Sequence, residues 1–201
     1  LFTATCRAAN LEQQLDQYLD MTNSNPPEAS AFLLELERQE LSTVAPPAKA
    51  RLWLYLAADF AAKQAPEQVQ QYFSKVAQLA DQTQNPDIRA DLLAHQLDYY
   101  WQLQQKEKTR AITPELAQAL HFASNERVIY FGHYTLGQVY EWANRLEEAL
   151  QAYQKAYQSI EASKHPRTKV RLLFVKLSMA RLNTSLAYQD KALALLNEGI
   201  E

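Results

Sequence analysis

The sequence predicts an all-α protein built from packed pairs of helices, and three features lead to that prediction. The first is a recurring helix-start signal around proline, found at Asn25-Pro26-Pro27-Glu28, Ala65-Pro66-Glu67, Asn85-Pro86-Asp87, Thr113-Pro114-Glu115 and His165-Pro166. Proline suits a first helical turn because its missing N–H has no partner there, and an acid beside it is favoured by the positive helix end. The second feature is the low glycine content, three in 201 residues, because an all-β fold needs glycine in its turns.

The third feature is a period of about forty residues along the chain. Pro46 and Pro86 lie forty residues apart, and Pro166 lies twice that distance beyond Pro86. Forty residues after Pro86, where the period would place a further proline, the residue is Glu126. It lies inside a polar stretch that predicts a break between helices. We therefore expect five helical hairpins in one repeat domain over 1–201, at roughly 6–45, 46–85, 86–125, 126–165 and 166–201.

The first three hairpins differ in how clearly they show helix packing. Hairpin 6–45 has only helical apolar periodicity, carried by Leu11, Leu15, Tyr18, Leu19, Phe32, Leu33 and Leu36. Hairpin 46–85 reads Trp53-x-x-Leu56-Ala57-x-x-Phe60, with Val69 twelve residues after Ala57 and Phe73 four further on. The first helix of 86–125 is apolar at Leu93, Leu97, Tyr100 and Trp101, but the small and large residues of its second helix are displaced.

The clearest hairpin lies within 126–165. It contains Leu136-Gly137-x-x-Tyr140, a polar turn at Asn144-Arg145, Ala149 twelve residues after the glycine, and Tyr153. Helices cross closely only where side chains are small, so Gly137 and Ala149 mark the crossing and the two tyrosines fill the space beside it. Hairpin 166–201 keeps the same interval, since Ala192 follows twelve residues after Ala180 and precedes Leu196.

This spacing resembles the tetratricopeptide repeat (TPR), whose pattern is W-x-x-L-G-x-x-Y followed by A-x-x-x-F. The resemblance is carried by 46–85, 126–165 and 166–201, and the forty-residue period is similar to that of extended TPR arrays in bacterial regulators and sensors. It implies a right-handed α-α superhelix and a non-enzymatic module that recognises a protein or peptide segment. It also implies the sensor or regulatory region, periplasmic or cytoplasmic, of a larger bacterial signalling protein. We expect further chain, because the sequence begins with Leu1 rather than Met and ends in helical sequence without a cap.

The resemblance further implies where a ligand binds, because the first helix of each hairpin then lines a concave groove. The candidates are Asp98, Trp101, Phe131, Tyr134, Gln138, Glu141, Trp142, Arg171, Phe174 and Arg181. Gln102 and Leu177 lie on the same helices, and Arg51 and Leu54 lie on the first helix of hairpin 46–85. A second interpretation stays open. Several of these aromatic side chains pack against neighbouring repeats, because Tyr and Trp serve equally well in a core and at an interface.

Charge is distributed unevenly although the net charge is only −3. Between Ala8 and Ala48 there are seven acids and one base, whereas between Ala162 and Gln189 there are six bases and no acid. One interpretation is that the basic side chains pair with acids of adjacent helices, such as Glu141 or Glu198. A second is that the basic end binds an acidic peptide or nucleic acid through arginine. A third is weak head-to-tail self-association between the two charged ends. The net charge disfavours a general nucleic-acid binder.

No motif for catalysis, a cofactor or a metal is found. The four histidines, His95, His121, His133 and His165, lie in separate segments without metal-ligand spacing. We interpret His133, which stands where the TPR pattern has tryptophan, as a packing residue. Gly132-x-x-x-x-Gly137 is followed by Gln138, where a phosphate-binding loop needs lysine. The lone Cys6 excludes an internal disulfide. We predict no enzyme, no cofactor and no membrane span, with an enzyme of unrecognised site as the alternative.

Overall fold

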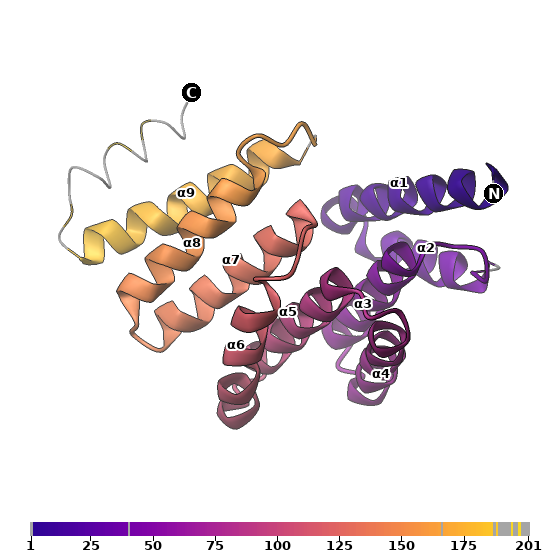
Figure 1. The fold of residues 1–201 in the computed structure, drawn as a ribbon, viewed down its shortest axis with the longest axis horizontal. Coiled ribbons are helices and arrows are strands. Elements are labelled where there is room, and N and C mark those ends of the chain that lie inside the picture. Colours follow the sequence, from indigo (N-terminus) through magenta and orange to yellow (C-terminus); the bar gives the residue numbers. More distant parts are fainter. Residues whose placement is uncertain are drawn as a thin grey trace. The chain divides into compact units, whose positions relative to one another are not determined.

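The computed structural model describes residues 2–39, 41–165, 167–186, 188, 194 and 197, with side chains from Leu11 onward except at Asn23. Over this part of the chain there are nine α-helices and no strand (Figure 1). The helices are α1 (Phe2–Ser24), α2 (Pro26–Arg38), α3 (Pro46–Ala62), α4 (Pro66–Thr83), α5 (Pro86–Gln102), α6 (Lys106–Ala119), α7 (Glu126–Trp142), α8 (Leu146–Ile160) and α9 (Thr168–Ser185). The all-α class is thus confirmed.

Four of the nine described helices, α2 to α5, begin at a proline. Helix α7 begins without one and is capped by Asn125. The side-chain oxygen of Asn125 accepts hydrogen bonds from the N–H groups of Arg127 (3.0 Å) and Val128 (3.3 Å). Asn85 caps α5 in the same way, although Pro86 follows it there.

The start signal at Thr113-Pro114 is wrong, because Pro114 lies inside α6. That helix begins at Lys106, and the Thr113 hydroxyl donates to the carbonyl of Thr109 within it (2.7 Å). A proline inside a helix lacks the N–H that would bond the carbonyl four residues earlier. The threonine–proline pair therefore marks an irregular position within α6.

The connections inside three hairpins share one backbone feature. Gln64, Gln104 and Asn144 adopt positive φ angles of 56°, 55° and 58°, and they lie forty residues apart. Each residue turns the chain from the first helix of its hairpin into the second, at the left-handed conformation that ends many helices. The period read from the prolines is therefore repeated in the turns.

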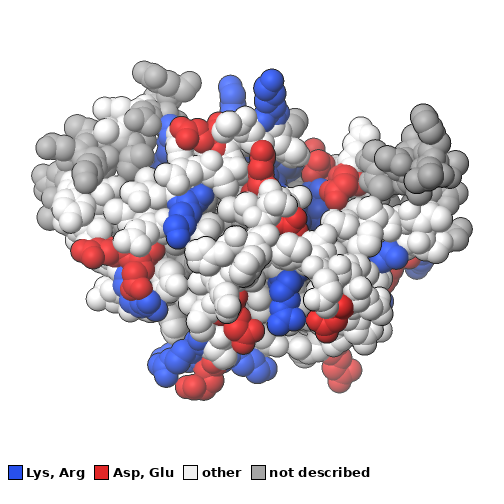
Figure 2. Space-filling view, viewed as in Figure 1, with Lys and Arg blue, Asp and Glu red and all other residues white. Residues whose placement is uncertain are grey.

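Contacts divide the chain into two compact units, Leu1–His95 and Gln96–Glu201, and each is described by itself. Basic and acidic side chains are interspersed on the face shown in Figure 2. The expectation of one repeat domain over 1–201 stays a prediction.

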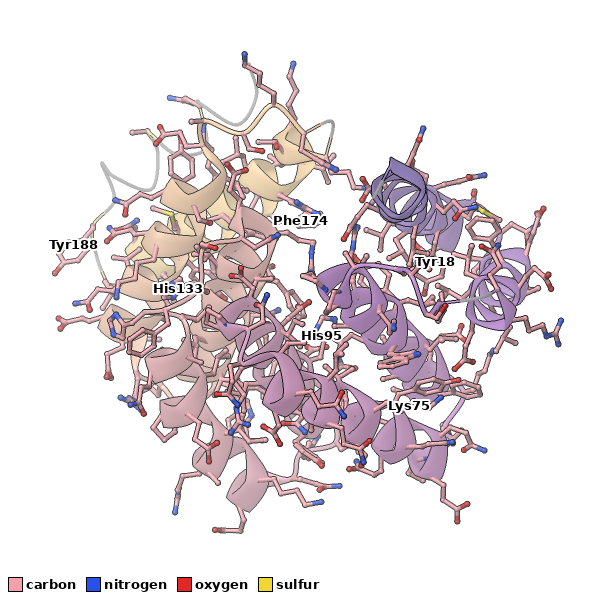
Figure 3. The ribbon with its side chains drawn as sticks, turned by 45° about the vertical axis from the view of Figure 1, so that its right-hand side comes forward. Tyr18, Lys75, His95, His133, Phe174 and Tyr188 are labelled. Carbon is pink, nitrogen blue, oxygen red and sulfur yellow. The ribbon has the colours of Figure 1, made fainter. Side chains whose placement is uncertain are left out.

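In the first unit, a buried arginine joins α1 to α3. Arg51 is 4% exposed; its Nη2 donates to Asp16 (2.5 Å), its Nη1 to Glu12, and its Nε to the Tyr55 hydroxyl (2.9 Å). The ring of Tyr18, labelled in Figure 3, lies 5.5 Å from that of Tyr55. Two acids of the negative N-terminal stretch are therefore neutralised inside their own chain.

In the second unit, α7, α8 and α9 share one core. Its buried members are Tyr130, Ala149, Tyr153, Ala156, Ile160, Val175 and Leu182. Gly137 lies directly against the ring of Tyr153, since a Cβ at that position would be 2.6 Å from Tyr153 Cε1. The close crossing expected from the small and large residues is therefore present. The corresponding residues Ala192 and Leu196, as well as Glu198 and the Cys6 side chain, lie outside the described residues.

Candidate functional site

Helix α9 has apolar side chains on two opposite sides. Val175 and Leu182 are at most 1% exposed and belong to the buried side. The opposite side has Val170 (56% exposed), Leu173 (40%), Phe174 (53%, labelled in Figure 3) and Leu177 (46%). Their spacing of i, i+3, i+4 and i+7 places the four on one helix face, which we call the α9 stripe. Clustered apolar side chains in contact with water indicate an interaction surface.

Two contacts connect α9 with α7 beside the stripe. Arg181 Nη2 donates to Glu141 Oε2 at 2.8 Å, and the guanidinium of Arg171 lies 5.4 Å from the ring centre of Tyr130. The first of these is the pairing with Glu141 that the charge pattern suggested. Because Arg181 is 63% exposed at its side chain, this ion pair contributes little stability, about 0–1 kcal/mol.

Glu141 also accepts a hydrogen bond from the hydroxyl of the core residue Tyr153 (3.1 Å). Burial and the nearby Glu141 carboxylate raise the pKa of Tyr153 above its ordinary value, so the phenol stays protonated as the donor. The partly buried Glu141 is thereby fixed between the core and the exposed Arg181.

Two predicted groove residues on α7 instead pack against the core. Phe131 and Tyr134 are partly buried against the α7–α9 cluster. The ring of Tyr134 stacks on Tyr130 at 5.8 Å and meets Tyr153 at 5.5 Å. For these two aromatic side chains the packing interpretation applies.

The remaining candidates are spread over several positions. Trp142, at the end of α7, is 49% exposed and lies 5.8 Å from Lys106 Nζ. Gln138 is partly buried on α7. On α5, Trp101 is partly buried and Asp98 accepts a hydrogen bond from Gln102 (2.8 Å).

Of the candidates on other helices, Arg51 and Leu54 are buried in the first unit, whereas Leu177 belongs to the α9 stripe. Val170 and Leu173 were not among the residues predicted from the sequence. Their spacing from Phe174 and Leu177 already indicated that all four lie on one helix face. The structure therefore brings the α9 stripe together with Arg181 and Glu141.

Other kinds of site were also considered. Among the described residues, no group of three His, Cys, Asp or Glu side chains is placed to hold a metal ion. None of the helices in that same part of the chain combines the length and the apolar character that a membrane span requires.

Comparison with known proteins bears on the fold. No family model and no curated protein matches the chain. The crystal structure of BtubC (BKLC) from P. vanneervenii matches with a TM-score of 0.61 at 11% identity, over 98% of this chain and 89% of that one. The fold is TPR-like. MamA from AMB-1 is also similar, with a TM-score of 0.46 and 14% identity over 95% of this chain and 90% of that one. At 11% identity, the likeness to BtubC shows a shared fold alone.

Proposed function

We propose that this chain is a non-enzymatic recognition module that binds a segment of another protein on the α9 stripe. The observation that carries the proposal is the exposure of four large apolar side chains on a helix whose other side is already packed. A TPR-like fold is typically a protein-binding scaffold, and exposed apolar faces of this kind bind amphipathic helices.

The partner we propose is an amphipathic helix with acidic residues beside its apolar face. Arg167 and Arg181 lie near the two ends of the stripe, and the exposed Lys169 lies along its side. The stretch from Ala162 to Gln189 contains no acid. Apolar side chains of the partner would cover the stripe, while its carboxylates would form charge-assisted hydrogen bonds with these bases. An acid that approaches Arg181 would share it with Glu141.

The other partners are less well supported. A nucleic acid needs a basic surface, whereas the net charge of the chain is −3. Head-to-tail self-association needs available acids near the N-terminus, but four of the seven acids there already form ion pairs within the chain: Glu12, Asp16, Glu35 and Glu37. The resemblance to extended TPR arrays also supports placing this module in the sensor or regulatory region of a larger bacterial signalling protein.

The proposal is tested with a short synthetic peptide that has leucines at i, i+3, i+4 and i+7 and glutamates beside them. Binding is measured by fluorescence anisotropy against the full chain. The paired change Phe174→Ala and Leu177→Ala is expected to weaken binding more than tenfold, because each removes an apolar side chain worth about 1.5–3 kcal/mol when buried.

The matched control is Phe122→Ala, which removes an aromatic side chain that is 69% exposed but lies outside α9. This variant should bind like the original chain, and a scrambled peptide of the same composition should not bind. Equal binding of the scrambled peptide, or equal losses in the control and the α9 variant, would contradict the proposal. A mass that rises with concentration in light scattering, without peptide, would favour self-association instead.

A further inference from the structure

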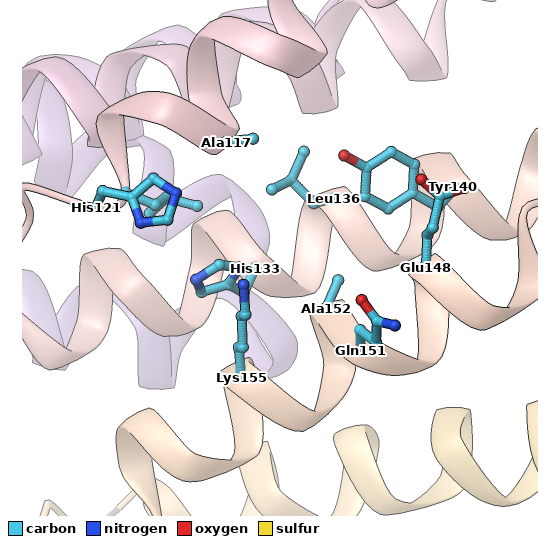
Figure 4. A pocket seen from close by; sticks show the side chains of 10 residues that line it. Ala117, His121, His133, Leu136, Tyr140, Glu148, Gln151, Ala152 and Lys155 are labelled. Carbon is cyan, nitrogen blue, oxygen red and sulfur yellow. The ribbon is translucent and has the colours of Figure 1, made fainter.

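A pocket of about 300 Å³ lies in the second unit, bounded by α6, α7, α8 and the residues just after α6 (Figure 4). Its apolar wall includes Ala117, Leu136 and Ala152, and its polar side chains include His121, His133 and Lys155. The volume is at the small end of the range for ligand sites, about 300–1,000 Å³. No residue of α9 lines it, so it is separate from the α9 stripe.

The pocket has an origin in the sequence. His133 occupies the position at which the TPR pattern has tryptophan, and the imidazole ring is smaller than an indole. Part of the space that tryptophan would fill beside Leu136 therefore stays open. The neighbouring Gly132 does not add to this space, since a Cβ there would come within 2.7 Å of Leu120 Cδ2.

Three nitrogen-bearing side chains meet at one end of the pocket. Figure 4 shows Lys155 reaching from α8 to the His133 ring of α7, with the His121 ring on the same side. Burial, followed by the charges of Lys155 and His121, lowers the pKa of His133 to about 4. His133 is therefore neutral at pH 7, and one of its ring nitrogens carries a proton to donate.

The other polar groups lie at the opposite end of the pocket. Tyr140, Glu148 and Gln151 are drawn there in Figure 4. The Glu148 carboxylate is bound by both the Nε and an Nη of Arg145. Glu148, the acid that lines the pocket, is thus already paired with Arg145. It lies at the other end of the pocket from Lys155 and the two histidines.

We propose that this pocket binds a small organic anion, a carboxylate on a short apolar or aromatic body. The carboxylate would accept hydrogen bonds from Lys155 and His133, since charge-assisted bonds of this kind are the strong ones. The body would lie against Leu136, Ala117 and Ala152. A bare inorganic anion would leave this apolar wall uncovered, and a neutral molecule would form no charge-assisted hydrogen bond with Lys155.

The test is isothermal titration calorimetry of the full chain with benzoate, and with benzamide and inorganic phosphate as comparison probes. Benzoate is expected to bind at least tenfold more tightly than either. Lys155→Gln, which preserves side-chain length and removes the charge, should weaken benzoate binding about tenfold. Lys155 and Lys169 are both exposed, but Lys169 lies on α9 and does not line the pocket, so Lys169→Gln should leave binding unchanged.

His133→Trp provides a second variant that restores the TPR pattern and fills the pocket, so benzoate binding should be lost while the melting temperature is retained. If that variant fails to fold, Lys155→Gln alone decides the matter. The proposal is overturned if benzoate does not bind, if benzamide or phosphate binds as tightly, or if Lys155→Gln binds benzoate like the original chain.

Discussion

At the scale of single residues, the turns of the hairpins depend on side chains that are poorly suited to their backbone conformation. Gln64, Gln104 and Asn144 all have positive φ angles, a region in which glycine has no steric penalty and other residues are disfavoured by about 1–2 kcal/mol. The turns therefore adopt a conformation that favours glycine, although the chain has few glycines. The residues that stand there instead lower the stability of the folded chain.

The first prediction is that Gln104→Gly stabilises the chain. Relief of the left-handed strain is partly offset by the greater freedom of glycine in the unfolded chain, so the expected gain is about 0.5–1 kcal/mol. Gln154→Gly, at an exposed position in the middle of α8, should destabilise by about 1 kcal/mol. Urea unfolding curves measure both, and two changes of the same sign would contradict the role of the positive φ angle.

A second residue-scale prediction concerns pH. The pKa of His133 is about 4 in the folded chain and about 6.5 when unfolded. Between these values the unfolded chain binds more protons, so stability falls as the pH drops from about 6.5 to about 4. In His133→Gln, the free energy of unfolding should fall less on acidification, by up to about 3 kcal/mol. Denaturation at pH 7 and pH 4.5 tests it, and an unchanged pH dependence in His133→Gln would contradict it.

At the scale of elements, the contact of α1 with α3 depends on one buried cation. The side chain of Arg51 is 5% exposed and meets Glu12 and Asp16, which are 44% and 34% exposed. Removal of one partner from a buried pair costs about 3–5 kcal/mol, and the exposure of the two acids reduces this figure because water screens the charges left behind.

We therefore predict that Arg51→Met lowers the free energy of unfolding by about 2–3 kcal/mol. The control is Arg38→Met, because Arg38 and Glu35 form an exposed pair whose loss should cost less than about 0.5 kcal/mol. Urea denaturation measures both variants. Equal effects would mean that burial of Arg51 contributes nothing.

The elements also show which features the sequence could predict. The contact of Gly137 with Tyr153 and the paired helices follow from short-range spacing, which depends only on helix geometry. The burial of Tyr134 and the exposure of Phe174 do not, because both are aromatic residues on a first helix and differ only in which neighbouring side chains cover them. Pro114 was placed at a helix start because the pattern cannot tell a first turn from an interior irregularity.

At the scale of the whole molecule, the TPR-like fold accounts for the candidate surface. Hairpins in such a fold stack on their neighbours, so each helix needs apolar side chains for its own core. Helix α9 meets that need with Val175 and Leu182 and still carries the α9 stripe on its other side. The apolar side chains of the stripe are therefore not needed for the core of the described residues. We propose that they bind a partner protein.

Hydrogen exchange of the full chain, with and without the acidic amphipathic peptide, tests this central claim most directly. Binding on the α9 stripe predicts slower exchange of backbone amides in α9 (Thr168–Ser185), with no change in α3 (Pro46–Ala62) or α4 (Pro66–Thr83). A peptide that binds while exchange in α9 stays the same, or that slows exchange only in α3 and α4, would contradict the assignment of the partner to this surface.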